Sequence, residues 1–191
     1  MKWISMLAFA ALAGSPSLTS AQTYVPQADA EKPRVQYADS LVSLNDQCAV
    51  AKRKLSLSVS PVYVNGQPVA FCCTACPAIF SKDPESYVKE FAPRLECPVA
   101  RGHDAVIEPS TRAYVNHDVF FFSDEKAMRT FVARPLRYAH HLSDPVSRNR
   151  FKPSAKSPHT VLDGRSFYFE SKDTYKAFQS DPGSYATRKG A

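Results

Sequence analysis

The chain has 191 residues, a formal net charge of +6 at pH 7 and 22% charged residues. Its lysines and arginines are dispersed along the sequence, and the nearest approach to a basic tract is the short run at residues 52–54. A nucleic-acid-binding groove requires clustered Lys and Arg interleaved with exposed aromatic side chains. We therefore expect no nucleic-acid partner.

The first 21 residues have the pattern of an export signal. Lys2 supplies the positive start, residues 3–13 form an apolar run, and small residues offer a cleavage site after Ala21. The apolar run is too short to cross a bilayer, and no later stretch approaches the roughly 20 apolar residues that a span needs. We therefore expect an exported chain, periplasmic or secreted, without a membrane span. Cleavage would remove Lys2 and no acidic residue, which lowers the net charge by one.

The next segment, residues 22–45, has the composition of a connection. It contains Pro26 and Pro33, mixed polar residues and no sustained hydrophobic period. We predict a tether over 22–45 and ordered structure from about Asp46 onward.

Four positions then recur three times with the same spacing. In each set the later residues follow the first by 9, 13 and 16 positions. This repetition predicts a triplicated unit of nearly 50 residues, which we name unit 1 (46–92), unit 2 (95–142) and unit 3 (143–188). The three sets are Phe71, Phe80, Pro84 and Tyr87; Phe122, Phe131, Pro135 and Tyr138; and Phe169, Phe178, Pro182 and Tyr185.

Each unit contains the signal of a β-hairpin. Asn65-Gly66 and Asp163-Gly164 are turn pairs that tolerate positive φ, and each lies between apolar runs. The corresponding pair in unit 2, Asn116-His117, is a poorer turn, so its hairpin is less strongly indicated.

Short helices should follow each hairpin. Thr74, Ser123 and Ser171 resemble helix N-caps, and Asp83-Pro84 and Asp181-Pro182 predict a second helical start. The recurring Phe and Tyr side chains are expected to form a small core in each unit rather than a surface on which ligands stack. The predicted fold is α+β, with three tandem small modules that each combine a hairpin with helix.

The cysteines do not follow the repeat. Only unit 1 has the full set of Cys48, Cys72, Cys73 and Cys76. Because two sister units lack these thiols, the fold does not require them, and their presence indicates a specific role in unit 1. By the repeat, Cys48 aligns with Cys97 and Asp144, Cys72 with Ser123 and Glu170, and Cys76 with Ala127 and Thr174.

This arrangement suits a metal ion. Cys72 and Cys76 should lie where a strand meets the N-terminus of a helix, and there the helix dipole and unpaired N–H groups favour thiolate. Cys48, brought alongside by the hairpin, would complete a trigonal set of sulfurs. Cys73 as a fourth ligand would give a tetrahedral zinc site, whereas three thiolates alone suit Cu(I) or another soft ion.

The pattern from Cys48 through Phe71-Cys72, Cys76, Phe80 and Asp83-Pro84 to Tyr87 resembles the YHS domain and the related TRASH domain. That resemblance implies a small treble-clef-like module for heavy-metal binding, sensing or trafficking, with metal ligands at Cys48, Cys72 and Cys76. The eponymous Tyr-His-Ser is absent, and units 2 and 3 lack the cysteine pair. The resemblance therefore implies one metal-binding module and two degenerate ones.

Two other roles for the thiols stay open. Cys73 and Cys76 form a C-x-x-C pair that could act as a redox dithiol, although hairpins replace the βαβ sheet of thioredoxin-like enzymes. A disulfide from Cys48 to Cys72 or Cys76 could instead stabilise a small unit. Either staple, disulfide or structural metal, would suit a non-catalytic scaffold for a protein partner.

Three further residues are possible additional ligands, namely Cys97, His140 and His141. The sequence shows no nucleophile–base–acid set, no phosphate loop and no HExxH motif, so we expect no enzyme. The predicted function is the buffering, delivery or sensing of zinc or copper by an exported protein.

Overall fold

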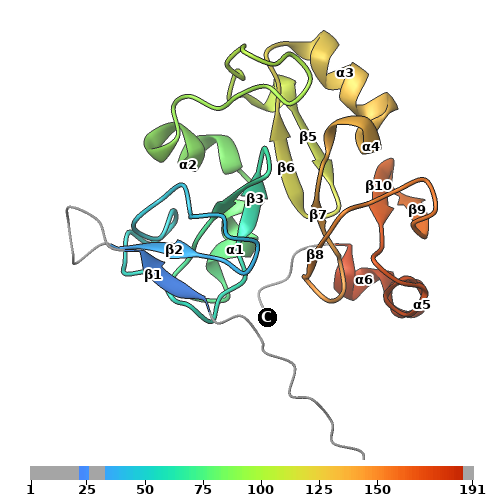
Figure 1. Ribbon diagram of the computed structural model, residues 1–191, viewed down its shortest axis with the longest axis horizontal. Helices are drawn as coiled ribbons and strands as arrows, with labels where there is room; N and C mark the ends of the chain where they lie inside the picture. Colours follow the sequence, from blue (N-terminus) through green and yellow to red (C-terminus); the bar gives the residue numbers. More distant parts are fainter. Residues whose placement is uncertain (1–21, 26–32, 187–191) are drawn as a thin grey trace, which may run out of the picture.

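The computed structural model describes residues 22–25 and 33–186, so the predicted export signal and the last residues of unit 3 lie outside the described residues. The chain contains both short helices and several small sheets (Figure 1), which confirms the α+β class. That the three units are separate treble-clef-like modules stays a prediction.

Unit 1 contains β3 (Val62–Val64), β4 (Gln67–Val69), α1 (Cys76–Phe80) and α2 (Pro84–Phe91). Unit 2 contains η1 (Pro109–Thr111), β5 (Arg112–Val115), β6 (Asp118–Phe121), α3 (Glu125–Ala133) and α4 (Pro135–Tyr138). They are followed by β7 (Leu142–Ser143), β8 (Arg150–Phe151), β9 (His159–Leu162), β10 (Arg165–Tyr168), α5 (Lys172–Ser180) and α6 (Pro182–Tyr185).

The segment expected to be a tether contains structure, which corrects that expectation. Strands β1 (Thr23–Val25) and β2 (Arg34–Gln36) pair antiparallel, and Val35 is fully buried in the core of unit 1. The Leu44 N–H donates to the carbonyl of Pro68 at 2.8 Å. Ordered structure therefore begins before Asp46. The sequence did not indicate it because strands of three residues are too short to show as a hydrophobic period.

All three predicted hairpins form with two-residue turns. The pairs that close them are Val64–Gln67, Val115–Asp118 and Leu162–Arg165. The first residue of each turn has positive φ, 46° at Asn65, 54° at Asn116 and 50° at Asp163. Asn and Asp enter this left-handed region at the lowest cost among residues with a side chain, so the weaker pair Asn116-His117 also turns the chain.

The helix starts differ in part from those predicted. Ser171 caps α5 by accepting the Thr174 N–H, and Asp83 and Asp181 precede α2 and α6 as expected. In unit 2, however, the cap is Asp124 rather than Ser123, because its carboxylate accepts the Ala127 N–H at 2.7 Å. Helix α1 begins at Cys76 with no side-chain cap, so Thr74 does not have the predicted role.

Paired aromatic rings lie at the centre of each unit. The ring centroids are 5.4 Å apart for Phe71 and Phe80, 4.9 Å for Phe122 and Phe131, and 5.1 Å for Phe169 and Phe178. These six rings are almost completely buried, in three separate hydrophobic clusters. The expectation that the recurring aromatics form core is confirmed.

Units 1 and 2 share one sheet. Its strand order is β4-β3-β6-β5, and the parallel contact between β3 and β6 runs through Val64 and Val119. In Figure 1 strands β3, β6 and β5 lie near the centre, with α1 and α2 on one side and β9, β10 and α5 on the other. The hairpin of unit 1 thus ends against the hairpin of unit 2.

An asparagine side chain ties the beginning of each unit to its hairpin. In unit 2 this residue is Asn65, from the hairpin turn of unit 1. Its Oδ1 accepts the Phe121 N–H at 2.7 Å, and its Nδ2 donates to the carbonyls of Phe121 (3.0 Å) and Glu96 (2.9 Å). We call this set of three hydrogen bonds an asparagine joint.

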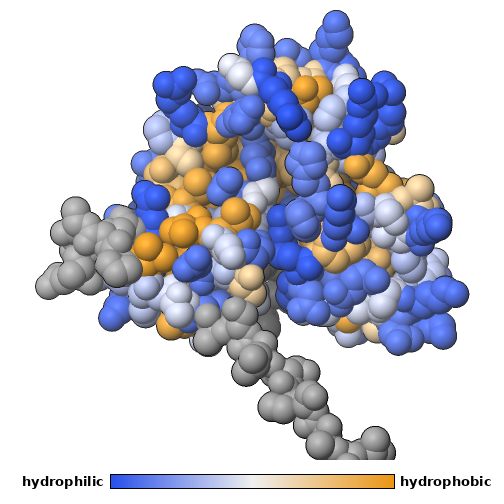
Figure 2. Space-filling model, in the orientation of Figure 1, coloured by the Kyte–Doolittle hydropathy of each residue, from blue (hydrophilic) through white to orange (hydrophobic). Residues whose placement is uncertain are grey.

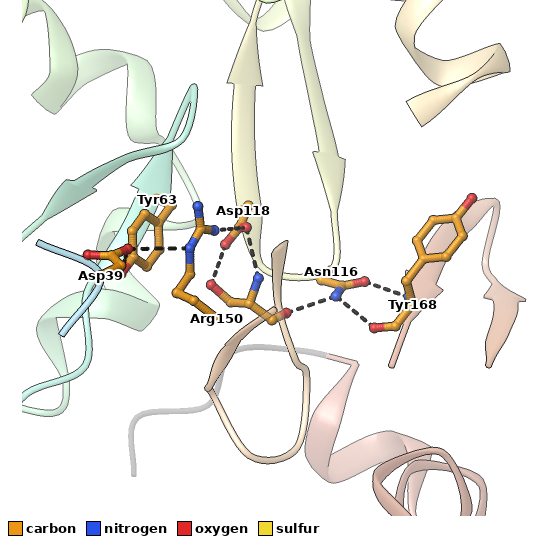
Figure 3. Close-up of polar contacts among 7 residues, drawn as sticks. Asp39, Tyr63, Asn116, Asp118, Arg150 and Tyr168 are labelled. Atoms are coloured by element: carbon orange, nitrogen blue, oxygen red, sulfur yellow. Dashed lines mark hydrogen bonds and ion pairs between the residues drawn. The ribbon is translucent and has the colours of Figure 1, made fainter. Parts of the chain in front are cut away.

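The same joint recurs in the other two units. Asn116, from the turn of unit 2, bonds both main-chain groups of Tyr168 and the carbonyl of Ser143, each at 2.8 Å (Figure 3). In unit 1 the preceding segment supplies Asn45, which bonds both main-chain groups of Ala70 and the carbonyl of Gln47 at 2.7–2.9 Å. Each joint gives both main-chain groups of a residue at the end of the hairpin, and one carbonyl at the beginning of the unit, a side-chain hydrogen-bond partner.

A buried ionic network crosses the units (Figure 3). Asp118, only 1% exposed, accepts from Arg150 Nη1 at 2.8 Å and from both the N–H and the hydroxyl of Ser143. The Arg150 guanidinium lies 3.6 Å from the ring centroid of Tyr63, whose hydroxyl donates to Asp39 at 3.0 Å. Arg150 Nε also lies 3.7 Å from Asp39 Oδ2, so this one arginine of unit 3 contacts unit 1, unit 2 and the segment before them.

The surface differs from one side of the molecule to the other. Figure 2 shows apolar side chains gathered over the region of β2, whereas the part of this face over α5 is mostly hydrophilic. Within residues 22–25 and 33–186 no helix has the length and apolar character that a membrane span requires.

Candidate metal centre

Three of the predicted ligands meet in unit 1. The Sγ atoms of Cys48, Cys72 and Cys76 all lie within 4.8 Å of one another, and those of Cys72 and Cys76 are 3.8 Å apart. Cys48 and Cys76 are buried and Cys72 is half-buried. Among the described residues this is the only group of three or more His, Cys, Asp or Glu side chains arranged to hold a metal ion.

Local structure brings the three sulfurs together. Cys72 follows the end of β4 by three residues, and Cys76 is the first residue of α1. Cys48 begins a tight turn in which the Lys52 N–H donates to its carbonyl at 2.9 Å. The Asn45 joint bonds Gln47, immediately before this turn, to Ala70, two residues before Cys72. Asn45 thus fixes the distance between the two cysteine-bearing segments.

The surroundings of Cys48 favour a negative charge on its sulfur. Burial alone raises the pKa of this thiol, but N–H groups of Ala51, Cys72 and Val50 directed at the sulfur outweigh burial and lower the pKa. The Ala51 N–H is 3.4 Å from Sγ. Consecutive backbone N–H groups that converge in this way form an anion-binding nest.

Unit 3 shows which group such a nest accommodates. The aligned residue there is Asp144, whose Oδ1 accepts the N–H groups of Val146 at 2.8 Å and Ser147 at 3.0 Å. In unit 2 the nest holds Cys97, with the Ala100 N–H 3.4 Å from its sulfur and the thiol pKa again lowered against the effect of burial. The same turn therefore surrounds a thiol, a thiol and a carboxylate in the three units.

In unit 3, hydrogen bonds join the residues that align with the three clustered cysteines of unit 1. The second oxygen of Asp144 accepts the Glu170 N–H at 2.9 Å and the Thr174 hydroxyl at 2.8 Å. Glu170 and Thr174 are the residues that align with Cys72 and Cys76. Unit 3 thus completes this region with oxygen and nitrogen groups, whereas unit 1 places three thiols there.

The other two thiols of the cluster resist ionisation, in contrast to Cys48. Burial, and after it the neighbouring thiols, raise the pKa of Cys76, and burial with the hydrogen bond to Cys48 raises the pKa of Cys72. The pKa of one thiol is lowered and the pKa values of the other two are raised, so all three ionise together only when a positive charge is close to them. A bound metal ion supplies that charge, and binding would release the protons.

Cys73 lies at the edge of the cluster. Its side chain is exposed, and its Sγ is 3.3 Å from that of Cys76, but it does not belong to the group formed by the other three sulfurs. A hydrogen bond with the Cys76 thiol and the N–H groups of Cys76 and Ala75 lower the pKa of Cys73. The fourth thiol is therefore the one most accessible to a reagent in solution.

The additional ligands proposed from the sequence lie elsewhere. Cys97 is fully buried in the hydrophobic cluster of unit 2. His140 and His141 are exposed and, with Cys97, line a cleft of about 650 Å³ between the loops of units 1 and 2. The structure does not bring these three residues to the cluster of Cys48, Cys72 and Cys76.

Sequence reasoning missed Asn45. It lies three residues before Cys48 and is 2% exposed, but the predicted tether ended at this position. A buried polar side chain with three hydrogen bonds is a long-range feature that no local pattern reports. Its one local signal is that an asparagine precedes the first cysteine where the composition changes.

No protein-family model, curated protein or solved structure matches the chain in comparisons with known proteins. The resemblance to YHS and TRASH domains stays a prediction that is based on the residues alone.

Proposed function

We propose that the protein is an exported heavy-metal-binding protein that holds one zinc or copper ion through Cys48, Cys72 and Cys76 and buffers, delivers or senses it. The observation that carries this proposal is the convergence of three sulfurs in unit 1, at positions where the aligned residues of unit 3 are joined by hydrogen bonds of Asp144. A fold that can complete this region without thiols has no structural need for three of them.

The spacing of the sulfurs supports the choice of metal. Tetrahedral zinc with Zn–S bonds of about 2.3 Å places its sulfurs roughly 3.8 Å apart, and Cys72 and Cys76 have this separation. Three protein ligands leave one position of zinc open to water or a partner's ligand, and they would satisfy trigonal Cu(I) completely. An incomplete shell favours exchange of the ion, as a carrier or buffer requires.

The test compares metal content in two proteins that begin at residue 22. One has the natural sequence, and the other carries Cys48→Asp and Cys76→Thr, which introduce the pair that unit 3 has at Asp144 and Thr174. We expect about one equivalent of zinc or copper in the natural chain, purified without oxygen, and none in the variant. Both should unfold cooperatively, because the introduced pair can form the hydrogen bond seen in unit 3.

Two outcomes would contradict the proposal. The first is a natural chain without metal whose thiols are paired by mass spectrometry, since this would make the cluster a disulfide staple. The second is a variant that keeps its metal, which would place the site elsewhere.

Removal of the metal should loosen unit 1 before the other units. Units 2 and 3 have their own aromatic clusters and the joints of Asn65 and Asn116, none of which includes the metal ligands. We expect hydrogen exchange in a chelated sample to rise first over residues 46–92. Equal loss of protection in all three units would instead indicate a scaffold that the metal holds together.

A further inference from the structure

We propose that Cys73 is the attacking thiol of a redox-controlled release mechanism, in which a disulfide between Cys73 and Cys76 removes Cys76 from the metal site. The metal-release part of this inference rests on the proposed function. The pairing of the two thiols does not, because it follows from their geometry alone.

The distances distinguish Cys73 from the ligands. Its Sγ is 3.3 Å from Cys76 Sγ, which is closer than the roughly 3.8 Å between two sulfurs on one tetrahedral zinc ion. The Cys72–Cys76 separation of 3.8 Å matches that value. Cys73 therefore lies beside a ligand rather than at a further corner of the coordination shell. A disulfide needs the two sulfurs to approach to about 2.05 Å, and Cys73 is the nearer partner.

Exposure determines the order of events. Cys48 is fully buried, Cys76 is 4% exposed and Cys72 is half-buried, whereas Cys73 is exposed. A small disulfide from solution therefore meets Cys73 first. Exchange rates depend on such access as well as on the fraction of thiolate.

The position of Cys73 in the fold also indicates a chemical role rather than a helix-capping role. It is two residues after Phe71, where units 2 and 3 have the helix caps Asp124 and Ser171 two residues after Phe122 and Phe169. Those caps accept an N–H group from the residue three positions later through a side-chain oxygen. A thiol is a weak acceptor, so capping alone does not account for cysteine at this place.

The reaction balances with a small disulfide such as oxidised glutathione as the electron acceptor. The Cys73 thiolate attacks one sulfur of that disulfide, forms a mixed disulfide and expels the other half as a thiolate. The Cys76 sulfur then attacks Cys73, closes the intramolecular disulfide and expels the second half. The protein pair loses two electrons, the small disulfide becomes two thiols, and the metal ion loses one of three protein ligands.

The experiment uses the chain from residue 22 loaded with zinc, and follows free zinc with a chromophoric chelator after addition of oxidised glutathione. We expect release in parallel with a Cys73–Cys76 disulfide, identified by peptide mapping. The variant Cys73→Ser reproduces the cap of unit 3 and should still bind one zinc ion. Its release should be about tenfold slower, because the accessible thiol is missing. Cys97→Ala removes a thiol outside the cluster and should release zinc at the natural rate.

Three outcomes overturn the proposal. If reduced Cys73→Ser binds no zinc, Cys73 is a ligand. If the variant releases zinc as fast as the natural chain, another thiol starts the exchange. If metal-free protein forms any disulfide other than Cys73–Cys76, the pairing is wrong. A natural chain that binds no metal but forms this disulfide would contradict the proposed function and the release step that rests on it, while the pairing of Cys73 with Cys76 would stand.

Discussion

Replacement of Arg150 by methionine is expected to lower the free energy of unfolding by about 3–5 kcal/mol, the range seen when one partner of a buried ion pair is removed. Asp118, at 1% exposure, would lose its ion pair with this arginine and keep its hydrogen bonds with Ser143. The substitution would also remove the guanidinium that lies on the ring of Tyr63. Urea unfolding, followed by circular dichroism, measures the change.

The matched control is Arg129→Met. Arg129 pairs with Glu125 at 3.0 Å on the surface of α3, with both side chains more than half exposed. Surface pairs at this spacing contribute only about 0.3–0.5 kcal/mol, so this variant should unfold close to the natural chain. A double variant, Asp118→Leu with Arg150→Met, should recover part of the loss because the buried carboxylate that pairs with Arg150 is removed together with it. Equal effects of the two single variants would show that the buried network contributes no more than a surface pair.

The parts of the fold that the sequence predicts correctly depend on local chemistry. Asn65-Gly66 and Asp163-Gly164 turn the chain because these residues accept positive φ, and the structure has a two-residue turn at each. The cysteine cluster was predictable for the same reason. Cys72 and Cys76 are four residues apart at the start of a helix, and the repeat places Cys48 near the beginning of unit 1, at the position of Cys97 and Asp144 in the other units. Three of the four sulfurs then meet as expected.

The features that the sequence does not reveal join residues far apart along the chain. Asn65 contacts Phe121 across 56 positions, and Arg150 contacts Asp118 across 32. An asparagine in a turn is already explained by its backbone angle, so nothing local indicates that its side chain also ties the next unit. The role of Cys73 depends on a difference of half an ångström between two sulfur distances, which spacing in the sequence cannot resolve.

Replacement of Asn45 by alanine is expected to weaken both the fold and the metal site. The side chain is 2% exposed and makes three hydrogen bonds, to the N–H and carbonyl of Ala70 and to the carbonyl of Gln47. Removal of one partner from a buried polar group costs about 1–3 kcal/mol, so we expect a loss of at least about 2 kcal/mol in unfolding free energy. Because the joint sets the distance between Cys48 and Cys72, zinc affinity should also fall by about 10–100-fold, the effect typical of groups that orient metal ligands.

The control that separates these two effects is Asn116→Gly. Asn116 makes the equivalent joint in unit 3 and is fully buried, but none of its partners adjoins the thiols. Glycine accepts the φ of 54° at this turn, so the substitution removes the joint without adding backbone strain. We expect a comparable loss of stability with zinc affinity unchanged, as measured by competition with a chelator of known affinity. If both variants lost affinity equally, general destabilisation would explain the result. If only Asn45→Ala did, the joint positions the ligands, and the segment before unit 1 belongs functionally to the metal site.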